Sequence, residues 1–311
     1  MPSFVRPDAD LPGTAPGDRR VGHLLGSRLA PGERPRAVLV GFPGDEGVRR
    51  NGGRPGAAQG PAAIRRALYR MTPDALGLEA HAALLGRTLD AGDLVLAGDL
   101  EADQEALGEA VAGWLEQGAF ALVLGGGHET AYGHFLGHAR ARRAVEILNI
   151  DAHADVREIR DGRGHSGSPF RQALLHPSGA CRRYRVAGLQ PQSVARDHLA
   201  WLEARGGRAV AAADLDARCL RELFAGLSSP ALATFDLDAL DQAFAPGVSA
   251  PAARGLSPAI WLEAAFLAGR TEAVASADVC ELCPPHDGEG RTARLAALTV
   301  WEILRGLAAR G

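Results

Sequence analysis

Lysine is absent from this chain of 311 residues, so all 34 basic side chains are arginines. Every cationic contact to a substrate must therefore come from arginine. Cysteine is also scarce, with four residues in the whole sequence. They are too few and too scattered to form a disulfide framework, which indicates reduced thiols. These cysteines are Cys181, Cys219, Cys280 and Cys283.

Long apolar runs are missing too. No segment reaches the roughly 18 consecutive apolar residues that a membrane span requires. Residues 1–17 are rich in proline and aspartate and have no apolar signal core, so a cytoplasmic location is expected. The formal net charge of −3 argues against a nucleic-acid or membrane-surface partner. A small molecule is the expected ligand.

The remaining composition favours one α/β domain. A hydrophobic content of 46% supports a substantial core, and the length is ordinary for a single domain. Residues 1–35 contain repeated Pro and Gly without periodicity, which predicts an N-terminal extension over the surface. Apolar runs typical of buried strands then alternate with helical patterns. The sequence predicts a single catalytic domain over residues 36–311, with a parallel sheet covered on both faces.

The predicted elements follow from apolar periodicity and from Gly and Pro punctuation. Strands are expected at residues 36–41, 94–96, 120–124, 144–148, 185–187, 231–236 and 273–277, with a further strand and helix in 208–227. Other helices are expected at residues 62–69, 101–116, 135–143, 169–175, 194–205, 263–268 and 292–309.

Metal-competent side chains recur at alternate positions directly after one apolar run. In an extended chain, alternate residues point to one face, so Asp151, His153 and Asp155 can converge on one point. Asp236 and Asp238 repeat this pattern after residues 231–233. Because ligands bind beyond the carboxyl ends of parallel strands, these residues are expected to share a site at one sheet edge.

His128, after the strand-like residues 120–124, completes this group of four carboxylates and two imidazoles. Packed near apolar strands, these carboxylates would repel one another without a cation. A single Asp after a strand is often a solvated cap, but six such residues make that interpretation improbable. Oxygen-rich ligation with some imidazole suits Mn²⁺ better than structural Zn²⁺. Two such ions, about 3.5–4 Å apart, can deprotonate a water that attacks a planar carbon.

These segments resemble the motif series of the ureohydrolase family, which comprises arginases, agmatinases and formimidoylglutamases. The resemblance covers the chain from residue 36 to the C-terminus and rests on Gly125-Gly126-Gly127-His128-Glu129, Asp151-Ala152-His153-Ala154-Asp155, Asp236-Leu237-Asp238 and Glu281. It implies the arginase-type fold, a three-layer α/β/α sandwich with a central, mostly parallel eight-stranded sheet. It also implies two Mn²⁺ ions per subunit and a homo-oligomer. One ion would be held by His128, Asp151, Asp155 and Asp236, and the other by Asp151, His153, Asp236 and Asp238.

The resemblance further implies catalytic roles. Asp155 would handle the proton of the bridging water, and Glu281 would hold the amidine or guanidine cation of the substrate. Arginases and agmatinases carry a proton-shuttling His before a Gly, where this chain has His165-Ser166-Gly167. Ser166 therefore occupies that position or His165 is displaced by one residue. For His165, a proton-transfer role and a plain loop position both stay open.

Three other segments, residues 51–57, 166–172 and 245–251, look most like formimidoylglutamases. Those enzymes hydrolyse N-formimidoyl-L-glutamate to L-glutamate and formamide in histidine degradation. A substrate with two carboxylates calls for arginine, and Arg157 and Arg171 are the candidate contacts, with Ser166 beside them. Arg157 continues the alternation from Asp155 toward the site. A surface position is the alternative for either arginine, more so for Arg171.

Two alternative functions stay open at this point. One is another ureohydrolase, of guanidinobutyrase, agmatinase or arginase type, which would release urea from a guanidino substrate. The other is a binding protein that has lost catalysis, against which the complete set of six ligands argues. Cys283 stands where relatives are expected to carry Asn, which would alter the orientation of Glu281. His134 and His138 are expected to be packing or helix-surface residues.

Overall fold

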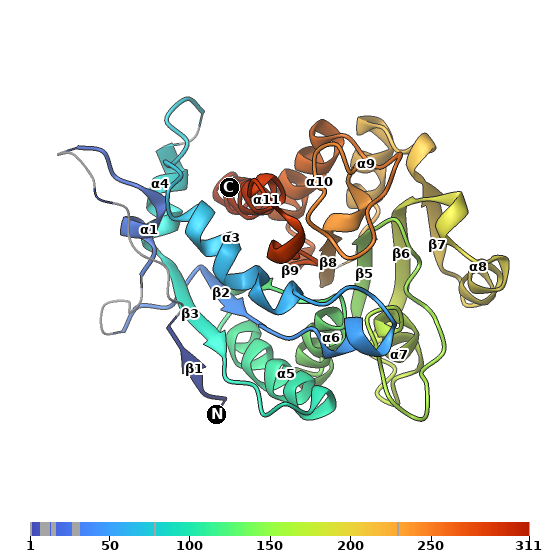
Figure 1. Cartoon of the computed structure of the whole chain (residues 1–311). Coiled ribbons are helices and arrows are strands. Elements are labelled where there is room, and N and C mark those ends of the chain that lie inside the picture. The colour runs from blue at the N-terminus through green and yellow to red at the C-terminus, as the bar shows by residue number, and fades with distance from the viewer. Residues whose placement is uncertain are drawn as a thin grey trace.

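The computed structural model describes residues 2–6, 13, 17–26, 32–77, 79–228 and 230–310. The predicted extension, residues 1–35, thus lies partly outside the described residues. Among those described, nine strands form one sheet in the order β1-β3-β2-β4-β9-β8-β5-β6-β7 (Figure 1). The strands are β1 Phe4–Val5, β2 Ala37–Gly41, β3 Thr88–Leu94, β4 Phe120–Leu124, β5 Val145–Ile150, β6 Cys181–Leu189, β7 Arg208–Ala211, β8 Ala231–Asp236 and β9 Val274–Cys280.

The sheet is parallel except at one edge. Strands β2 to β9 pair in parallel, and only β1 runs antiparallel, against β3, among the described strands. The predicted mostly parallel sheet is therefore confirmed. Its count rises from eight to nine because the short β1 comes from the N-terminal extension, where no periodicity signals a strand. Every residue of β2, β4, β5 and β8 is buried, as expected for strands covered on both faces.

Helices cover both faces and complete the predicted three layers. In Figure 1, α3, α10 and α11 lie on one side of the sheet, and α5 and α6 lie on the other. Neighbouring residues of β2 divide between the two cores: Leu39 packs with Ile64 and Ile303, whereas Val40 packs with Leu107. The helices are α1 Val21–Leu24, α2 Glu46–Arg50, α3 Gly60–Leu68, α4 Glu79–Gly86, α5 Leu100–Glu116, α6 Thr130–Arg140, α7 Pro169–Leu175, α8 Arg196–Glu203, α9 Ala217–Ala225, α10 Pro258–Arg270 and α11 Arg291–Ala308.

Two of the strands that differ from their predicted bounds do so because they carry buried polar residues. Strand β3 spans Thr88–Leu94 rather than 94–96. Its carboxylates Asp90 and Asp93 pair with Arg65, whose side chain on α3 is fully buried. Strand β9 likewise extends past residue 277, through the buried Asp278. A buried pair or network satisfies such groups, but apolar periodicity cannot reveal it. None of the helices in the described part of the chain has the length and apolar character needed to cross a bilayer.

Candidate metal centre

Four neighbouring strands deliver the predicted ligands to one edge of the sheet. Strands β4, β9, β8 and β5 are adjacent in the sheet order, and all four run parallel. The chain beyond β4 carries His128, β8 ends at Asp236, and β5 is followed by Asp151. Glu281 directly follows β9. The carboxyl ends of these strands therefore gather residues that lie far apart in the sequence.

The first cluster surrounds one ring nitrogen of His128. Its Nδ1 lies 2.9 Å from Asp155 Oδ2, 3.1 Å from Asp236 Oδ2 and 3.4 Å from Asp151 Oδ2. The ligand atoms of these four residues all lie within 4.8 Å of one another. One ion could therefore contact all of them, and they are the four residues that the resemblance assigns to the first ion.

The second cluster surrounds His153. Its Nδ1 lies 3.0 Å from Asp238 Oδ2 and 3.5 Å from Asp151 Oδ1, and these three residues also meet within 4.8 Å. Asp151 therefore belongs to both clusters. Asp236, the other predicted shared ligand, is not among the residues that meet around His153, and its Oδ1 accepts a hydrogen bond from the Asp238 backbone N–H at 2.8 Å.

The ligand run after β5 is bent rather than extended. Strand β5 ends at Ile150, and the His153 backbone N–H donates to Asp151 Oδ1 at 2.6 Å, which turns the chain. Asp155 has φ 46°, in the left-handed region that non-glycine residues rarely adopt. The three side chains thus converge through a local turn, and the alternation expected for an extended strand is not the cause. Glu281, at φ 70°, is held in the same unusual region.

Burial and mutual repulsion perturb the acids of the site. Burial, together with the charge of Asp238, raises the pKa of Asp236 well above its usual value. Burial raises the pKa of Asp238 to about 6, although His153 opposes the shift. Burial raises the pKa of Glu281 as well, with Asp236 adding to it. A cation at this position would relieve the repulsion that holds these protons in place.

The donor set fits divalent metal ions. Burial alone would lower the pKa of His128, yet Asp236 and the hydrogen bonds to Asp151 and Asp155 hold it well above its usual value. Asp238 Oδ1 is buried and has no hydrogen-bond partner among the described residues. An orphaned carboxylate oxygen beside other carboxylates is what a metal ligand looks like without its ion. Carboxylate oxygens with two imidazoles suit Mn²⁺.

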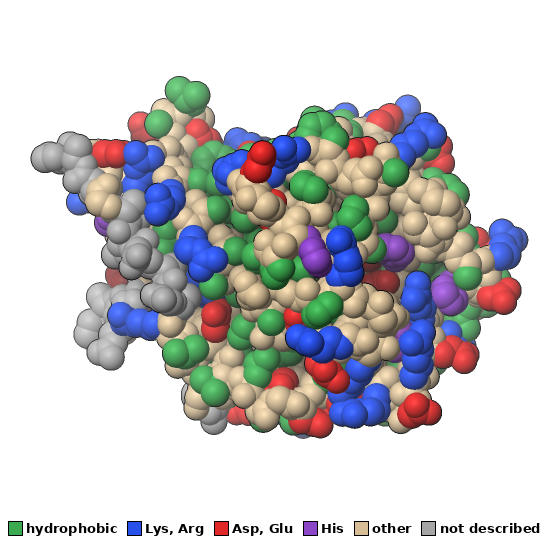
Figure 2. All heavy atoms as spheres, viewed as in Figure 1, with side chains coloured by type: hydrophobic (Ala, Val, Ile, Leu, Met, Phe, Trp, Pro, Cys, Tyr) green, Lys and Arg blue, Asp and Glu red, His purple; other side chains and the backbone are tan. Residues whose placement is uncertain are grey.

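A cavity of about 200 Å³ opens above the two clusters. Figure 2 shows histidine and acidic side chains together in a hollow near the middle of this face. Beyond the metal ligands and Glu281, polar groups of three loops line it, including Asn51, Arg157, Ser166 and Ser249. Asn51 joins two of them, because its Oδ1 accepts from Arg157 Nη1 and its Nδ2 donates to Ser166 Oγ, each at 3.1 Å.

Of the predicted site residues outside the two clusters, two do not line this cavity. His165 is buried, its Nε2 lies 2.9 Å from the Glu158 carbonyl oxygen, and its Nδ1 accepts from the Gly167 N–H. Both ring nitrogens therefore hold the loop around Ser166. Arg171 donates to Glu158 Oε1 at 2.6 Å and lies 4.4 Å above the Trp201 ring.

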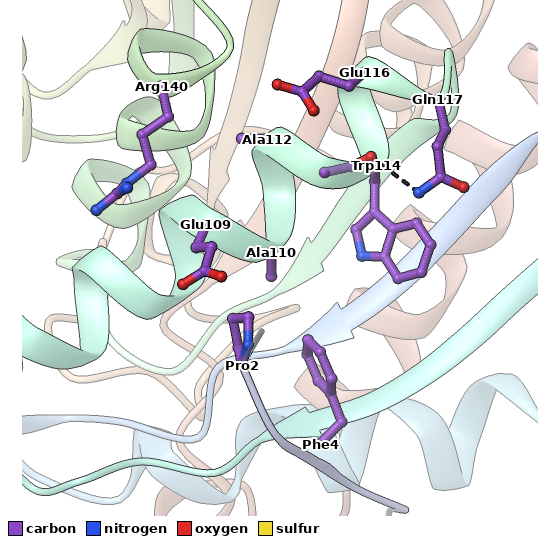
Figure 3. A pocket seen from close by; sticks show the side chains of 10 residues that line it. Pro2, Phe4, Glu109, Ala110, Ala112, Trp114, Glu116, Gln117 and Arg140 are labelled. Atoms are coloured by element: carbon purple, nitrogen blue, oxygen red, sulfur yellow. Dashed lines mark hydrogen bonds between the residues drawn. The ribbon is translucent and has the colours of Figure 1, made fainter.

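A larger cavity, of about 350 Å³, lies elsewhere, between β1 and α5. Figure 3 shows the rings of Phe4 and Trp114 beside Pro2, with the carboxylates of Glu109 and Glu116 around them. The residues that line it, all within the described ranges, include no histidine and none of the predicted site residues. Its size therefore does not make it the metal centre.

Several supporting residues were absent from the sequence prediction. Asn149 Nδ2 donates to Asp151 Oδ2 at 2.8 Å, and Thr234 Oγ1 lies 2.9 Å from His128 Nε2. Asn149 precedes Asp151 by two positions and Thr234 precedes Asp236 by two, a spacing that could have indicated both. Asn51 lies inside a segment that carries the resemblance, but nothing in its spacing points to Arg157.

The sequence profile of the arginase family matches residues 35–306 of this chain. The chain belongs to the arginase family. This arginase-family hydrolase is 44% identical to the formimidoylglutamase of Nocardia farcinica over 297 residues, which cover 91% of this chain and 90% of that protein. It is 38% identical to the formimidoylglutamase of Salmonella paratyphi A over 274 residues, which cover 86% and 84% of the two chains.

Solved structures of similar proteins have the same fold. The crystal structure of Trypanosoma cruzi formiminoglutamase with Mn²⁺ superposes with a TM-score of 0.87 at 34% identity, covering 94% of this chain and 100% of that one. Proclavaminate amidino hydrolase from Streptomyces clavuligerus superposes with a TM-score of 0.79 at 25% identity, covering 99% and 97%. The arginase-type fold predicted from the sequence is thereby confirmed.

Proposed function

We propose that this arginase-family protein is a formimidoylglutamase that uses two Mn²⁺ ions to hydrolyse N-formimidoyl-L-glutamate. The products would be L-glutamate and formamide, a step of histidine degradation. The observation that carries the proposal is one cavity with two chemically different ends. Metal-competent acids and Glu281 line its floor, and Arg157, Asn51 and Ser166 line another part of its wall.

The floor of the cavity suits the reacting group. His128, Asp151, Asp155 and Asp236 would hold one ion, and Asp151, His153 and Asp238 the other. When bound, the metal pair would supply hydroxide from a water near neutral pH and would stabilise negative charge. The resemblance of the motifs, the Mn²⁺ of the Trypanosoma cruzi crystal structure and the oxygen-rich donor set support this choice of ion.

The chain's own side chains would position the substrate and move the proton. Glu281 Oε1 accepts from the His128 backbone N–H at 2.8 Å, which leaves Oε2 to accept hydrogen bonds from the amidinium group. The oxygen of water would bond to the formimidoyl carbon, and the bond from that carbon to the glutamate nitrogen would break. Asp155 would take the proton that the water loses and return it to the departing amine.

The cationic part of the wall suits a carboxylate. The guanidinium of Arg157 makes one hydrogen bond within the described part of the chain, to Asn51, so most of its five N–H donors are left for a ligand. Arg–carboxylate contacts are strong and often bidentate. A guanidino amine such as agmatine would instead bring a second cation toward Arg157. This difference in charge favours the dicarboxylate amidine over agmatine.

Product analysis tests the proposal. Mn²⁺-loaded protein should release formamide and glutamate from N-formimidoyl-L-glutamate, with little urea from arginine, agmatine or guanidinobutyrate. The variant Asp155→Asn, which keeps the shape but loses the proton acceptor, should be inactive on all of them. Urea release without formamide would assign the protein to another branch of the family. Inactivity toward all four substrates after Mn²⁺ addition would point to a binding protein that has lost catalysis.

A further inference from the structure

A chain of buried polar groups runs from His128 into the core, away from the cavity. His128 Nε2 lies 2.9 Å from Thr234 Oγ1, and that hydroxyl donates to Asp278 Oδ1 at 2.5 Å. Asp278 Oδ2 lies 2.8 Å from Nδ1 of His134, on α6. The side chains of Thr234, Asp278 and His134 are fully buried. None of them belongs to the predicted metal or substrate set.

The sheet itself builds this chain. Thr234 on β8 and Asp278 on β9 are register partners in neighbouring parallel strands, so their side chains leave the same face of the sheet. Helix α6 covers that face and presents His134 to Asp278. Cys280 adds a weak contact, with its Sγ 3.5 Å from Asp278 Oδ1. Three elements thus fix the carboxylate without exposing it to water.

The hydrogen bonds have only one consistent direction. An ionised carboxylate can only accept, and a threonine hydroxyl has a single proton. Because Thr234 gives that proton to Asp278, it must accept from His128 Nε2, which therefore carries hydrogen. The other ring nitrogen, Nδ1, faces the three carboxylates of the first cluster. In the neutral ring that ligates metal, only Nδ1 can then offer a lone pair, and it points where an ion would lie.

We propose that Thr234 and Asp278, supported by His134, are positioning residues that hold the His128 ring in the tautomer and orientation needed to ligate metal. The inference rests on the proposed metal at His128 and does not depend on the identity of the substrate. Partners of this kind on a metal-bound histidine are commonly worth about 10- to 100-fold in metal affinity.

The test compares Thr234→Val with Thr234→Ser. Valine keeps the branched shape but removes the hydroxyl, so His128 Nε2–H would face an apolar group in a buried position. Serine keeps the hydroxyl. Free Mn²⁺ is followed by its electron paramagnetic resonance signal as each metal-free protein is titrated, which gives the number of sites and their dissociation constants without an activity assay. We expect Thr234→Val to weaken one of two sites by about 10- to 100-fold. Thr234→Ser should restore the affinity to within about threefold of the unmodified chain.

A second buried pair on the same strand supplies the control. Ser276 on β9 lies 2.8 Å from His138 Nε2 and is fully buried like Asp278, and within the described residues its hydroxyl bonds to none of the metal ligands. Ser276→Ala should lower the free energy of unfolding, because a buried hydrogen bond is lost, while both Mn²⁺ dissociation constants stay unchanged. A general loosening of the core would instead affect Mn²⁺ binding in both variants.

The outcomes separate this inference from the proposed function. If the unmodified chain binds no Mn²⁺ pair, the proposed metal centre is wrong. If it binds two ions and Thr234→Val binds them equally well, the positioning role is refuted. Should Thr234→Val not fold, by circular dichroism, Asp278→Asn takes its place. The amide of the new asparagine can donate to Thr234 and so reverse the direction of the hydrogen bonds between His128 and residue 278. Unchanged Mn²⁺ affinity in that variant would overturn the inference.

Discussion

Replacing Arg157 with glutamine tests the proposed contact between this residue and a carboxylate of the substrate. Glutamine retains a polar group of similar reach but removes the charge and the bidentate geometry. A hydrogen bond to a charged partner contributes about 1.5–3 kcal/mol, and each 1.36 kcal/mol is tenfold in binding. We therefore expect Arg157→Gln to lower kcat/KM for N-formimidoyl-L-glutamate by about 10- to 150-fold.

The division of this loss between the two kinetic constants is also predicted. Arg157 would contact the distal carboxylate in the ground state and in the transition state alike, so the change should appear mostly in KM rather than in kcat. Steady-state kinetics with the Mn²⁺-loaded enzyme measures both. Formamidine, a small amidine without carboxylates, should be hydrolysed at the same slow rate by both proteins.

Two further arginines of the same region serve as references. Arg160 is exposed, lies three residues away and does not line the cavity, so Arg160→Gln should leave kinetics unchanged. Arg171 is engaged by Glu158 and Trp201, so Arg171→Gln should change kcat/KM less than about threefold despite its sequence-based assignment. A loss for Arg157→Gln no larger than that for Arg160→Gln would refute the recognition argument.

Three other predictions concern the centre and its support. In Gly126→Ala, the new Cβ would lie 1.8 Å from the Gly44 carbonyl oxygen, so urea denaturation should show a loss of about 3 kcal/mol, against almost none for the unhindered Gly113→Ala. Equal losses would contradict this reasoning. Because the pKa of Asp238 is about 6, Mn²⁺ must displace its proton below that pH, and titrations should show affinity falling as the pH drops from 7 to 5. A flat profile would contradict it. When free Mn²⁺ is present at 100 times the dissociation constant of a site, its binding contributes about 2.7 kcal/mol to the free energy of unfolding. Chelation should remove this amount for each site, as chemical denaturation with and without chelator can show.

The raised pKa of Asp238 also makes the stability of the metal-free protein depend on pH, in the opposite direction to the Mn²⁺ affinity. Folded Asp238 binds its proton more tightly than it would in the unfolded chain. Its contribution to stability is therefore present at low pH and is lost as the pH rises through about 6. Asp238→Asn should remove this part of the pH dependence in denaturation of the metal-free form.

Sequence patterns predicted the fold, and they pointed to residues that the structure brings together at the cavity floor, because both depend on short-range signals. Buried parallel strands produce apolar runs, and the ligands follow those runs directly, as Asp151 follows β5 and His128 follows β4. The geometry behind the pattern was different, since Asp151 and His153 meet through a turn stabilised by the Asp151 carboxylate. A spacing of two residues is compatible with both conformations.

Contacts across long sequence distances could not be predicted in the same way. Thr234 and Asp278 meet through sheet register, and His134 reaches Asp278 from a helix 144 positions earlier. Arg157 and Arg171 were both predicted substrate contacts, yet one lines the cavity and the other packs on Trp201. The difference comes from Asn51 and from a ring on α8, neither of which leaves a periodic signal.

The left-handed backbone at Asp155 and Glu281 bears on how this protein can be engineered. Glycine is the residue that such a conformation favours, so Asp155→Gly and Glu281→Gly would relieve backbone strain in the metal-free protein. A library selected for thermal tolerance in the absence of metal would therefore enrich substitutions at these two positions and lose the acids that the proposed reaction needs. Directed evolution of a more thermostable variant therefore has to keep both residues unchanged or select for enzymatic activity in every round.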